Sequence, residues 1–140
     1  MNDKLSRVID ANCNRTREGL RVLEEIGRFW LDDKNVFNEI KKTRHDFSKI
    51  ESEIKISSKN IIASRDSIND VGKQYIQNLE GKRDNISSLV TANAKRVEES
   101  LRVLEEFLKL IDKNNITQQI KQIRFKTYTL EKQIHDELKK

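Results

Sequence analysis

Two asparagine–arginine pairs stand at matching places in this chain. Asn12 and Arg15 are three residues apart, and Asn93 and Arg96 repeat that spacing eighty-one residues later. On a helix this spacing puts both side chains on one face, because successive residues turn by about 100°. A guanidinium can hold phosphate oxygens with two hydrogen bonds, and an amide offers both a donor and an acceptor to a planar ring. The pairs therefore predict a pocket for an anionic ligand.

Both pairs interrupt an otherwise apolar stripe. The apolar residues of the first stripe are Leu5, Val8, Val22, Leu23, Ile26 and Trp30. Gly19 extends the face of the first pair, and Ser100 extends that of the second. A buried polar group without a partner costs about 1–3 kcal/mol, so a bundle built only for stability would carry Leu or Ile at these places. Three explanations stay open: a polar pocket between two halves, a satisfied network in the core, and an arginine whose charged end reaches out to solvent.

The chain contains an internal repeat. Ala11–Glu25 and Ala92–Glu106 are identical at ten of fifteen positions, and the similarity resumes at a spacing of eighty after a one-residue slip. Self-similarity of this kind indicates a duplicated supersecondary unit. We therefore expect two copies of a helical hairpin joined by a connector.

Periodicity and turn residues predict an all-α four-helix bundle made of two duplicated hairpins. The expected helices cover residues 4–31, 36–55, 85–111 and 116–138. The expected organisation is a single domain over 1–140, with repeat one over 4–55, a long functional connector over 56–85, a short extra helix over 73–79 and repeat two over 86–139.

Further charged residues lie beside the stripes and in the connector. Arg44 and Arg124 hold equivalent positions in the two repeats, where an ion pair with another helix explains them as well as a ligand site does. The connector carries a second set: Arg65, Arg83, Asp66, Asp70 and Gly72. Such a set suits a loop that binds phosphate and Mg²⁺, since Mg²⁺ needs only one or two carboxylates beside ligand phosphates. A solvated crossover with Asx turns is the favoured alternative.

Composition narrows the classes of function. Charged residues make up 36% of the chain, proline is absent and the net charge is +5, which suits solvated helices and anionic ligands. Aromatic residues make up only 6% and acidic residues alternate with basic ones, which disfavours nucleic-acid binding. Without a signal peptide or an apolar run of about 20 residues, we expect a cytoplasmic protein that does not bind membranes. The lone Cys13 excludes an internal disulfide.

Four stretches resemble one known family. In chain order they are IDANCNRTREGLRVLEEIGRF, KKTRHDF, ASRDSINDVG and LVTANAKRVEESLRVLEEFLKL. They look like the small, all-helical, monofunctional hydroxymethylpyrimidine-phosphate kinases of thiamine biosynthesis, which occur alone or fused in front of thiamine-phosphate synthase. The resemblance implies a phosphotransferase that uses ATP and Mg²⁺ to convert 4-amino-5-hydroxymethyl-2-methylpyrimidine phosphate to the diphosphate.

The resemblance also implies a set of site residues. Those that match the family motifs are Asn12, Arg15, Glu18, Arg21, Arg44, His45, Arg65, Asp66, Asp70, Gly72, Asn93, Arg96 and Glu99. Phosphoryl transfer depends on positioning and charge neutralisation, so we expect arginines to clamp the phosphates in a cleft between the repeats. The expected catalytic residues are Arg15, Arg96, Arg44 and Arg65, and Arg124 joins the expected binding residues. Asp66 and Asp70 are the expected Mg²⁺ ligands.

The alternative function is a non-catalytic helical domain, for dimerisation or regulation, associated with thiamine-phosphate synthase. It explains the repeated VLEE segments but leaves the inward asparagine–arginine pairs without a role. Under the main hypothesis the partners are a pyrimidine phosphate and a nucleotide. Assembly of identical chains is compatible with both hypotheses.

Overall fold

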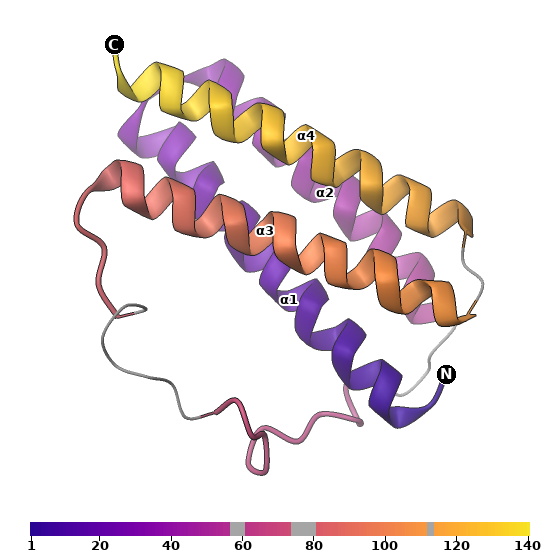
Figure 1. Cartoon of the computed structure of the whole chain (residues 1–140). Helices are drawn as coiled ribbons and strands as arrows, with labels where there is room; N and C mark the ends of the chain where they lie inside the picture. Colours follow the sequence, from indigo (N-terminus) through magenta and orange to yellow (C-terminus); the bar gives the residue numbers. More distant parts are fainter. Residues whose placement is uncertain (57–60, 74–80, 112–113) are drawn as a thin grey trace.

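The computed structural model describes residues 1–56, 61–73, 81–111 and 114–140, and within these ranges it confirms an all-α bundle. Its α-helices are α1 (Asp3–Glu25), α2 (Lys34–Ile56), α3 (Ile86–Leu108) and α4 (Asn114–Leu138) (Figure 1). A π-helix, Ile26–Trp30, continues α1, and a 3-10 helix, Lys109–Ile111, continues α3. The short helix expected over 73–79 lies, apart from its first residue, outside the described residues.

Polar side chains cap the first turns of α1, α2 and α3. Asn2 and Asn85 each accept, at 2.8 Å, a hydrogen bond from the backbone N–H three residues later. Asp33 does the same for the N–H of Val36 at 3.1 Å. These oxygens satisfy N–H groups of the first turn that have no acceptor inside the helix. Each cap therefore sets the residue at which its helix begins.

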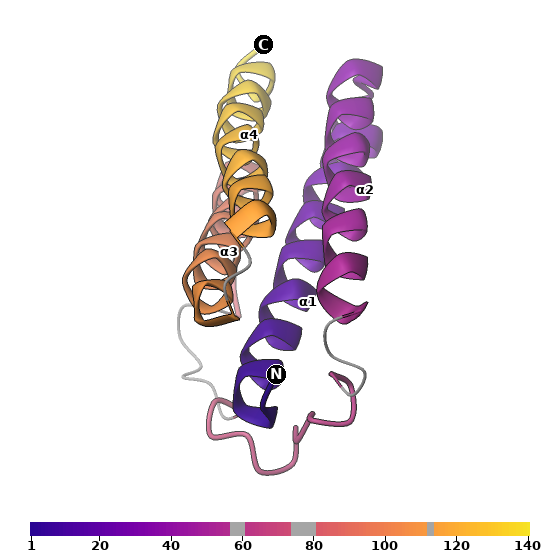
Figure 2. The same ribbon diagram turned by 90° about the vertical axis from the view of Figure 1, so that its right-hand side faces the viewer.

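The two hairpins pack side by side, α1 with α2 and α3 with α4 (Figure 2). Between the hairpins, α1 lies against α3 and α2 lies against α4, and neighbouring helices run antiparallel (Figure 1). The first repeat therefore packs on the second as a subunit packs on its twin in a two-fold dimer. The α1–α2 turn lies at the end of the bundle that holds the C-terminus.

α1 and α3 meet closely at the middle of this pseudo-symmetric contact. The hydroxyl oxygens of Thr16 and Ser100 are 2.7 Å apart. A Cβ atom added at Gly19 would lie 2.6 Å from Val97 Cγ2 and 3.0 Å from the Asn93 carbonyl oxygen. In the repeat, Thr16 corresponds to Val97 and Gly19 to Ser100, so each helix sets one larger and one small residue against the other. The small residues allow the two backbones to approach.

The buried face of α1 is wider than the predicted stripe and is centred elsewhere. Ile9, Cys13 and Leu20 are at most 1% exposed, whereas Arg15 is exposed and Trp30 is 65% exposed. The cause is that α1 contacts both α2 and α3, so its buried face must cover both directions. The π-helix adds to the difference, because its wider turn carries Trp30 to the surface at the hairpin tip.

Candidate functional site

A cleft of about 510 Å³ opens on the outer side of the contact between α1 and α3. Its lining residues are Asn12, Arg15, Arg83, Ala92, Lys95, Arg96, Glu99, Ser100 and Val103. Four of these side chains are cationic and one is anionic. The cleft therefore carries an excess of positive charge, and it unites the first predicted arginine with its counterpart from the second repeat.

The asparagines of the two pairs bind their own helices. The Asn12 amide donates to the Val8 carbonyl at 2.8 Å, and the Asn93 amide donates to the Leu89 carbonyl at 2.9 Å. The Asn12 side-chain oxygen accepts a hydrogen bond from Arg15 at 3.3 Å. Asn12 therefore anchors Arg15 at the mouth of the cleft, and contact of its amide with a planar ring stays a prediction.

Arg15 and Arg96 are two exposed arginines of the cleft. Within the part of the chain that the structure describes, no carboxylate lies within ion-pair distance of either guanidinium. Glu99 lines the same cleft without pairing with them at that distance. A planar guanidinium has five N–H donors, so Arg15 keeps most of its donors for an external acceptor even while it binds Asn12. The arrangement suits a phosphate or another multivalent anion.

The structure corrects the prediction that Arg44 and Arg124 face a common cleft. Glu24 holds Arg44 with two hydrogen bonds, at 2.8 and 3.1 Å, and Glu105 holds Arg124 in the same way, at 2.5 and 3.1 Å. The bond to Glu105 raises the pKa of Arg124 above its usual value. Both glutamates are buried, so these bidentate pairs join the two helices of each hairpin. The interhelical ion pair, left open by the sequence, is the correct explanation.

Arg65 also lies away from the cleft. Its guanidinium binds the buried carboxylate of Asp10 with hydrogen bonds of 2.5 and 2.8 Å. Asp10 and Asn12 are two residues apart on α1, so their side chains are turned by about 200° from each other. Arg65 therefore fastens the start of the connector to the side of α1 that faces away from the cleft.

The acidic residues of the connector stabilise turns. Asp66 accepts hydrogen bonds from the Asn69 backbone and side chain at 3.0 to 3.2 Å, and Asp70 accepts one from the Gly72 N–H at 2.8 Å. All of these residues are exposed. Among the described residues, no three His, Cys, Asp or Glu side chains are grouped as metal ligands. Binding of Mg²⁺ by Asp66 and Asp70 stays a prediction from sequence alone.

The remaining predicted residues are spread around the bundle. Glu18 and Arg21 line a shallow cavity of about 320 Å³ together with Arg17 and Arg44. Arg21 lies 3.3 Å from Glu24. His45 is exposed on α2 and is not part of the cleft lining.

Sequence reasoning missed one cation of the cleft, Lys95, and placed another, Arg83, in a phosphate-binding connector loop. Lys95 replaces Asn14 of the first repeat, and Glu98 replaces Arg17. The first replacement adds a positive charge and the second turns a positive charge into a negative one, although most of the surrounding repeat is identical. That paired exchange was the signal that could have identified Lys95.

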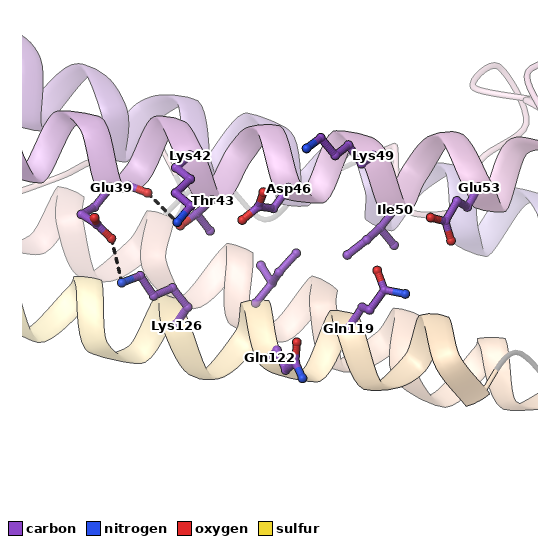
Figure 3. A pocket seen from close by; sticks show the side chains of 11 residues that line it. Glu39, Lys42, Thr43, Asp46, Lys49, Ile50, Glu53, Gln119, Gln122 and Lys126 are labelled. Atoms are coloured by element: carbon purple, nitrogen blue, oxygen red, sulfur yellow. Dashed lines mark hydrogen bonds and ion pairs between the residues drawn. The ribbon is translucent and has the colours of Figure 1, made fainter.

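A second groove lies between α2 and α4 (Figure 3). Its volume is about 500 Å³, and the ion pair between Glu39 and Lys126, at 2.8 Å, crosses it. The charged residues of its lining are Glu39, Asp46, Glu53, Lys42, Lys49 and Lys126. Three acidic and three basic side chains neutralise each other, so this groove does not attract anions as the α1–α3 cleft does.

The lone cysteine is a packing residue. Cys13 is 1% exposed, and burial raises the pKa of its thiol to about 12. Because the thiolate is the reactive form, we expect no measurable reaction of native protein with a thiol reagent near neutral pH. Titration with such a reagent, before and after unfolding in urea, should count one thiol only in the unfolded protein. Rapid labelling of the native protein would contradict this assignment.

Fold and cleft together define a duplicated helical domain with a cationic cleft. Comparison of the sequence with models of protein families shows that the ThiD2 family model matches residues 7–133. The chain therefore belongs to the ThiD2 family. Within the described ranges, no helix combines the length and apolar composition needed to cross a bilayer.

Similar curated proteins carry one name, thiamine-phosphate synthase. The protein of Nostoc punctiforme is 41% identical over 89% of this chain and 34% of its own length. That of Synechocystis sp. is 40% identical over 91% of this chain and 35% of its own length, and that of Rhodopirellula baltica is 37% identical over 87% and 32%. The chain thus spans about a third of the length of these relatives. No solved structure matches it.

These findings correct the expectation of a phosphotransferase. The relatives are named for a synthase, a transferase that is not a kinase, and the small helical domain is not a kinase fold. The link to thiamine biosynthesis that the resemblance implied is retained, as is the link to thiamine-phosphate synthase.

Proposed function

We propose that this chain is a regulatory helical domain of thiamine-phosphate synthesis, which binds a phosphorylated small molecule in the α1–α3 cleft and acts on thiamine-phosphate synthase. The ligand class is a pyrimidine phosphate or a nucleotide, both of which present phosphate oxygens beside a planar ring. This is the non-catalytic alternative that the sequence left open, now with a role for its arginines.

One observation carries the proposal. Arg15 and Arg96 lie in one cleft without carboxylate partners among the described residues, whereas Arg44, Arg65 and Arg124 all have them. Keeping two guanidinium groups uncompensated near each other is unfavourable unless an anion joins them. Other exposed arginines of α1 and α3, Arg21 and Arg102, do have carboxylates nearby, so an external ligand best explains the missing partners of Arg15 and Arg96.

The similarity to the synthases supports the second half of the proposal. The match covers about a third of each relative, so those chains carry a region like this one together with a larger part. A regulatory domain that senses a phosphorylated substrate or product would fit beside such a part, whether joined to it or separate. The cleft is on one outer side of the bundle, which leaves the remaining faces for contact with a synthase.

The first experiment measures ligand binding by calorimetry. Replacement of Arg15 or Arg96 with Ala should weaken binding of the pyrimidine phosphate by about tenfold or more each, because a charge-assisted hydrogen bond contributes roughly 1.5–3 kcal/mol. Both residues are exposed, so circular dichroism should show an unchanged fold. Arg102→Ala is the matched control, since Arg102 is an exposed arginine of α3 that pairs with Glu106 at 2.9 Å outside the cleft.

The second arm tests regulation. Adding this chain to a thiamine-phosphate synthase should change the turnover of the synthase in a manner that depends on the bound ligand, and the Arg15→Ala chain should lose that effect. Equal binding by the Ala variants and the parent chain would overturn the ligand site. If the chain binds the ligand but has no effect on the synthase, the ligand site is supported and its regulatory role is refuted.

A further inference from the structure

One ammonium group at the edge of the cleft stands between two carboxyl groups. Lys95 Nζ lies 3.1 Å from Glu98 on its own helix and 3.5 Å from Glu131 on α4. The side chain of Glu98 is only 3% exposed, and that of Glu131 is 14% exposed. Lys95 itself is half exposed and lines the cleft. The cluster therefore connects the interior of the α3–α4 hairpin to the proposed ligand site.

One oxygen of this cluster lacks a partner. Glu98 Oε2 is buried, and no group among the described residues donates a hydrogen bond to it. A buried carboxylate oxygen without a donor is costly, and a proton shared with a second carboxyl group removes that cost. Burial and the contact with Glu131 raise the pKa of Glu98 to about 7. The unpartnered oxygen and the raised pKa both favour a proton on the Glu98 carboxyl group at roughly neutral pH.

The first repeat shows what the exchange of residues changed. There Arg17 lies 2.9 Å from Glu51, and Lys55 lies 3.4 Å from the same glutamate, so one carboxylate has two cations. In the second repeat two carboxyl groups share one ammonium. On its remaining side α3 meets α1, which presents Thr16 and Gly19, and neither side chain titrates. Lys95 and Glu131 are therefore the charged groups that act on Glu98.

We propose that Lys95 is a ligand-binding cation of the cleft whose release is controlled by the proton that Glu98 and Glu131 share. This inference rests on the proposed function, because it assumes an anion in the α1–α3 cleft. With the proton in place, the cluster of Lys95, Glu98 and Glu131 is neutral. Lys95 then has to break its ion pair with only one charged carboxylate in order to bind the ligand. Without it, the cluster carries one net negative charge, which holds Lys95 and repels the ligand. Anion binding therefore takes up a proton from solvent.

The sign of the pH effect follows from this linkage. Affinity for an anion should fall as the pH rises through about 7, by up to about tenfold for each pH unit while one proton is linked. In the ligand-free protein, a carboxyl with a raised pKa stabilises the fold at low pH and loses that contribution as the pH rises towards about 7. Glu98→Gln should remove both effects, because the amide keeps the shape of the side chain and cannot titrate.

Sulfate is the probe for the test, since its charge stays constant from about pH 6 to about pH 8, where Glu98 changes its own. Affinities are measured over this range for the parent chain, for Glu98→Gln and for Glu106→Gln, an exposed charge-matched control on the same helix. We expect the parent and Glu106→Gln to lose affinity as the pH rises and Glu98→Gln to stay constant. The double change Lys95→Asn and Glu98→Arg, which installs the first-repeat residues, should bind more weakly and without pH dependence.

Three outcomes separate the two proposals. Sulfate binding by the parent chain that does not depend on pH overturns the role of the shared proton and leaves the ligand site intact. The same pH dependence in Glu98→Gln as in the parent also overturns it. Absence of binding at every pH, with the fold verified by circular dichroism, overturns both this inference and the proposed site.

Discussion

Replacing Gly19 with Val is expected to lower the free energy of unfolding by about 3 kcal/mol, the upper end of typical overpacking costs. The first atom of the new side chain would lie 2.6 Å from Val97 Cγ2 and 3.0 Å from a backbone oxygen of α3. Val97 is fully buried, so the clash can be relieved only by moving α1 and α3 apart. Helix propensity opposes this cost, but the gain of Val over Gly is only a few tenths of a kcal/mol. Urea unfolding followed by circular dichroism measures the difference.

Two further variants show that the contact with α3 is the cause. Gly72→Ala places a Cβ in ordinary contact at 3.4 Å, so its stability should stay within about 0.5 kcal/mol of the parent. Gly19→Ser combined with Val97→Thr copies the Ser100 and Thr16 pair of the other half. It should be more stable than Gly19→Ser alone. A Gly19→Val protein as stable as the parent would show that the helices do not meet as closely as described.

Periodicity was sufficient to predict the helices but not the direction in which each side chain points. The asparagine caps and the hairpins follow from local sequence, and the structure confirms the bundle. The face of α1 was misplaced because a helix with two neighbours has a wide buried face, and a single stripe describes only part of it. Arg15 lies at the edge of that face, where a small rotation decides between core and cleft.

Sequence reasoning could not separate the arginines of the cleft from those that join helices, for a related reason. Arg44 and Arg124 repeat as faithfully as Arg15 and Arg96, so the repeat alone cannot separate a ligand-binding arginine from one that holds two helices together. Only the partner distinguishes them, and the partners Glu24 and Glu105 are about twenty residues away in sequence. Both glutamates belong to the VLEE segments. If the glutamates of these segments had been assigned to ion pairs between helices, Arg44 and Arg124 would have been identified as structural residues.

The ion pair of the second repeat should give the largest effect of a single substitution. Arg124→Met leaves the carboxylate of Glu105, which is 3% exposed, without its bidentate partner. Breaking a buried pair in this way costs roughly 3–5 kcal/mol, because the remaining charge stays in the interior. Urea unfolding of the variant against the parent chain measures the loss. Arg102→Met, which removes an exposed cation 3.8 Å from the same glutamate, should cost less than about 1 kcal/mol.

The two repeats supply an internal comparison. Arg44→Met should destabilise the chain in the same direction but less, because Arg44 is 21% exposed against 12% for Arg124, and Arg21 remains 3.3 Å from Glu24. Replacing Arg124 and Glu105 together, by Met and Gln, should restore most of the lost stability, since no uncompensated charge is left. Equal losses for Arg124→Met and the double variant would mean that packing of the arginine side chain, and not its charge, stabilises the hairpin. Such a result would also weaken the argument that an arginine without a carboxylate partner, as at Arg15 and Arg96, indicates a ligand.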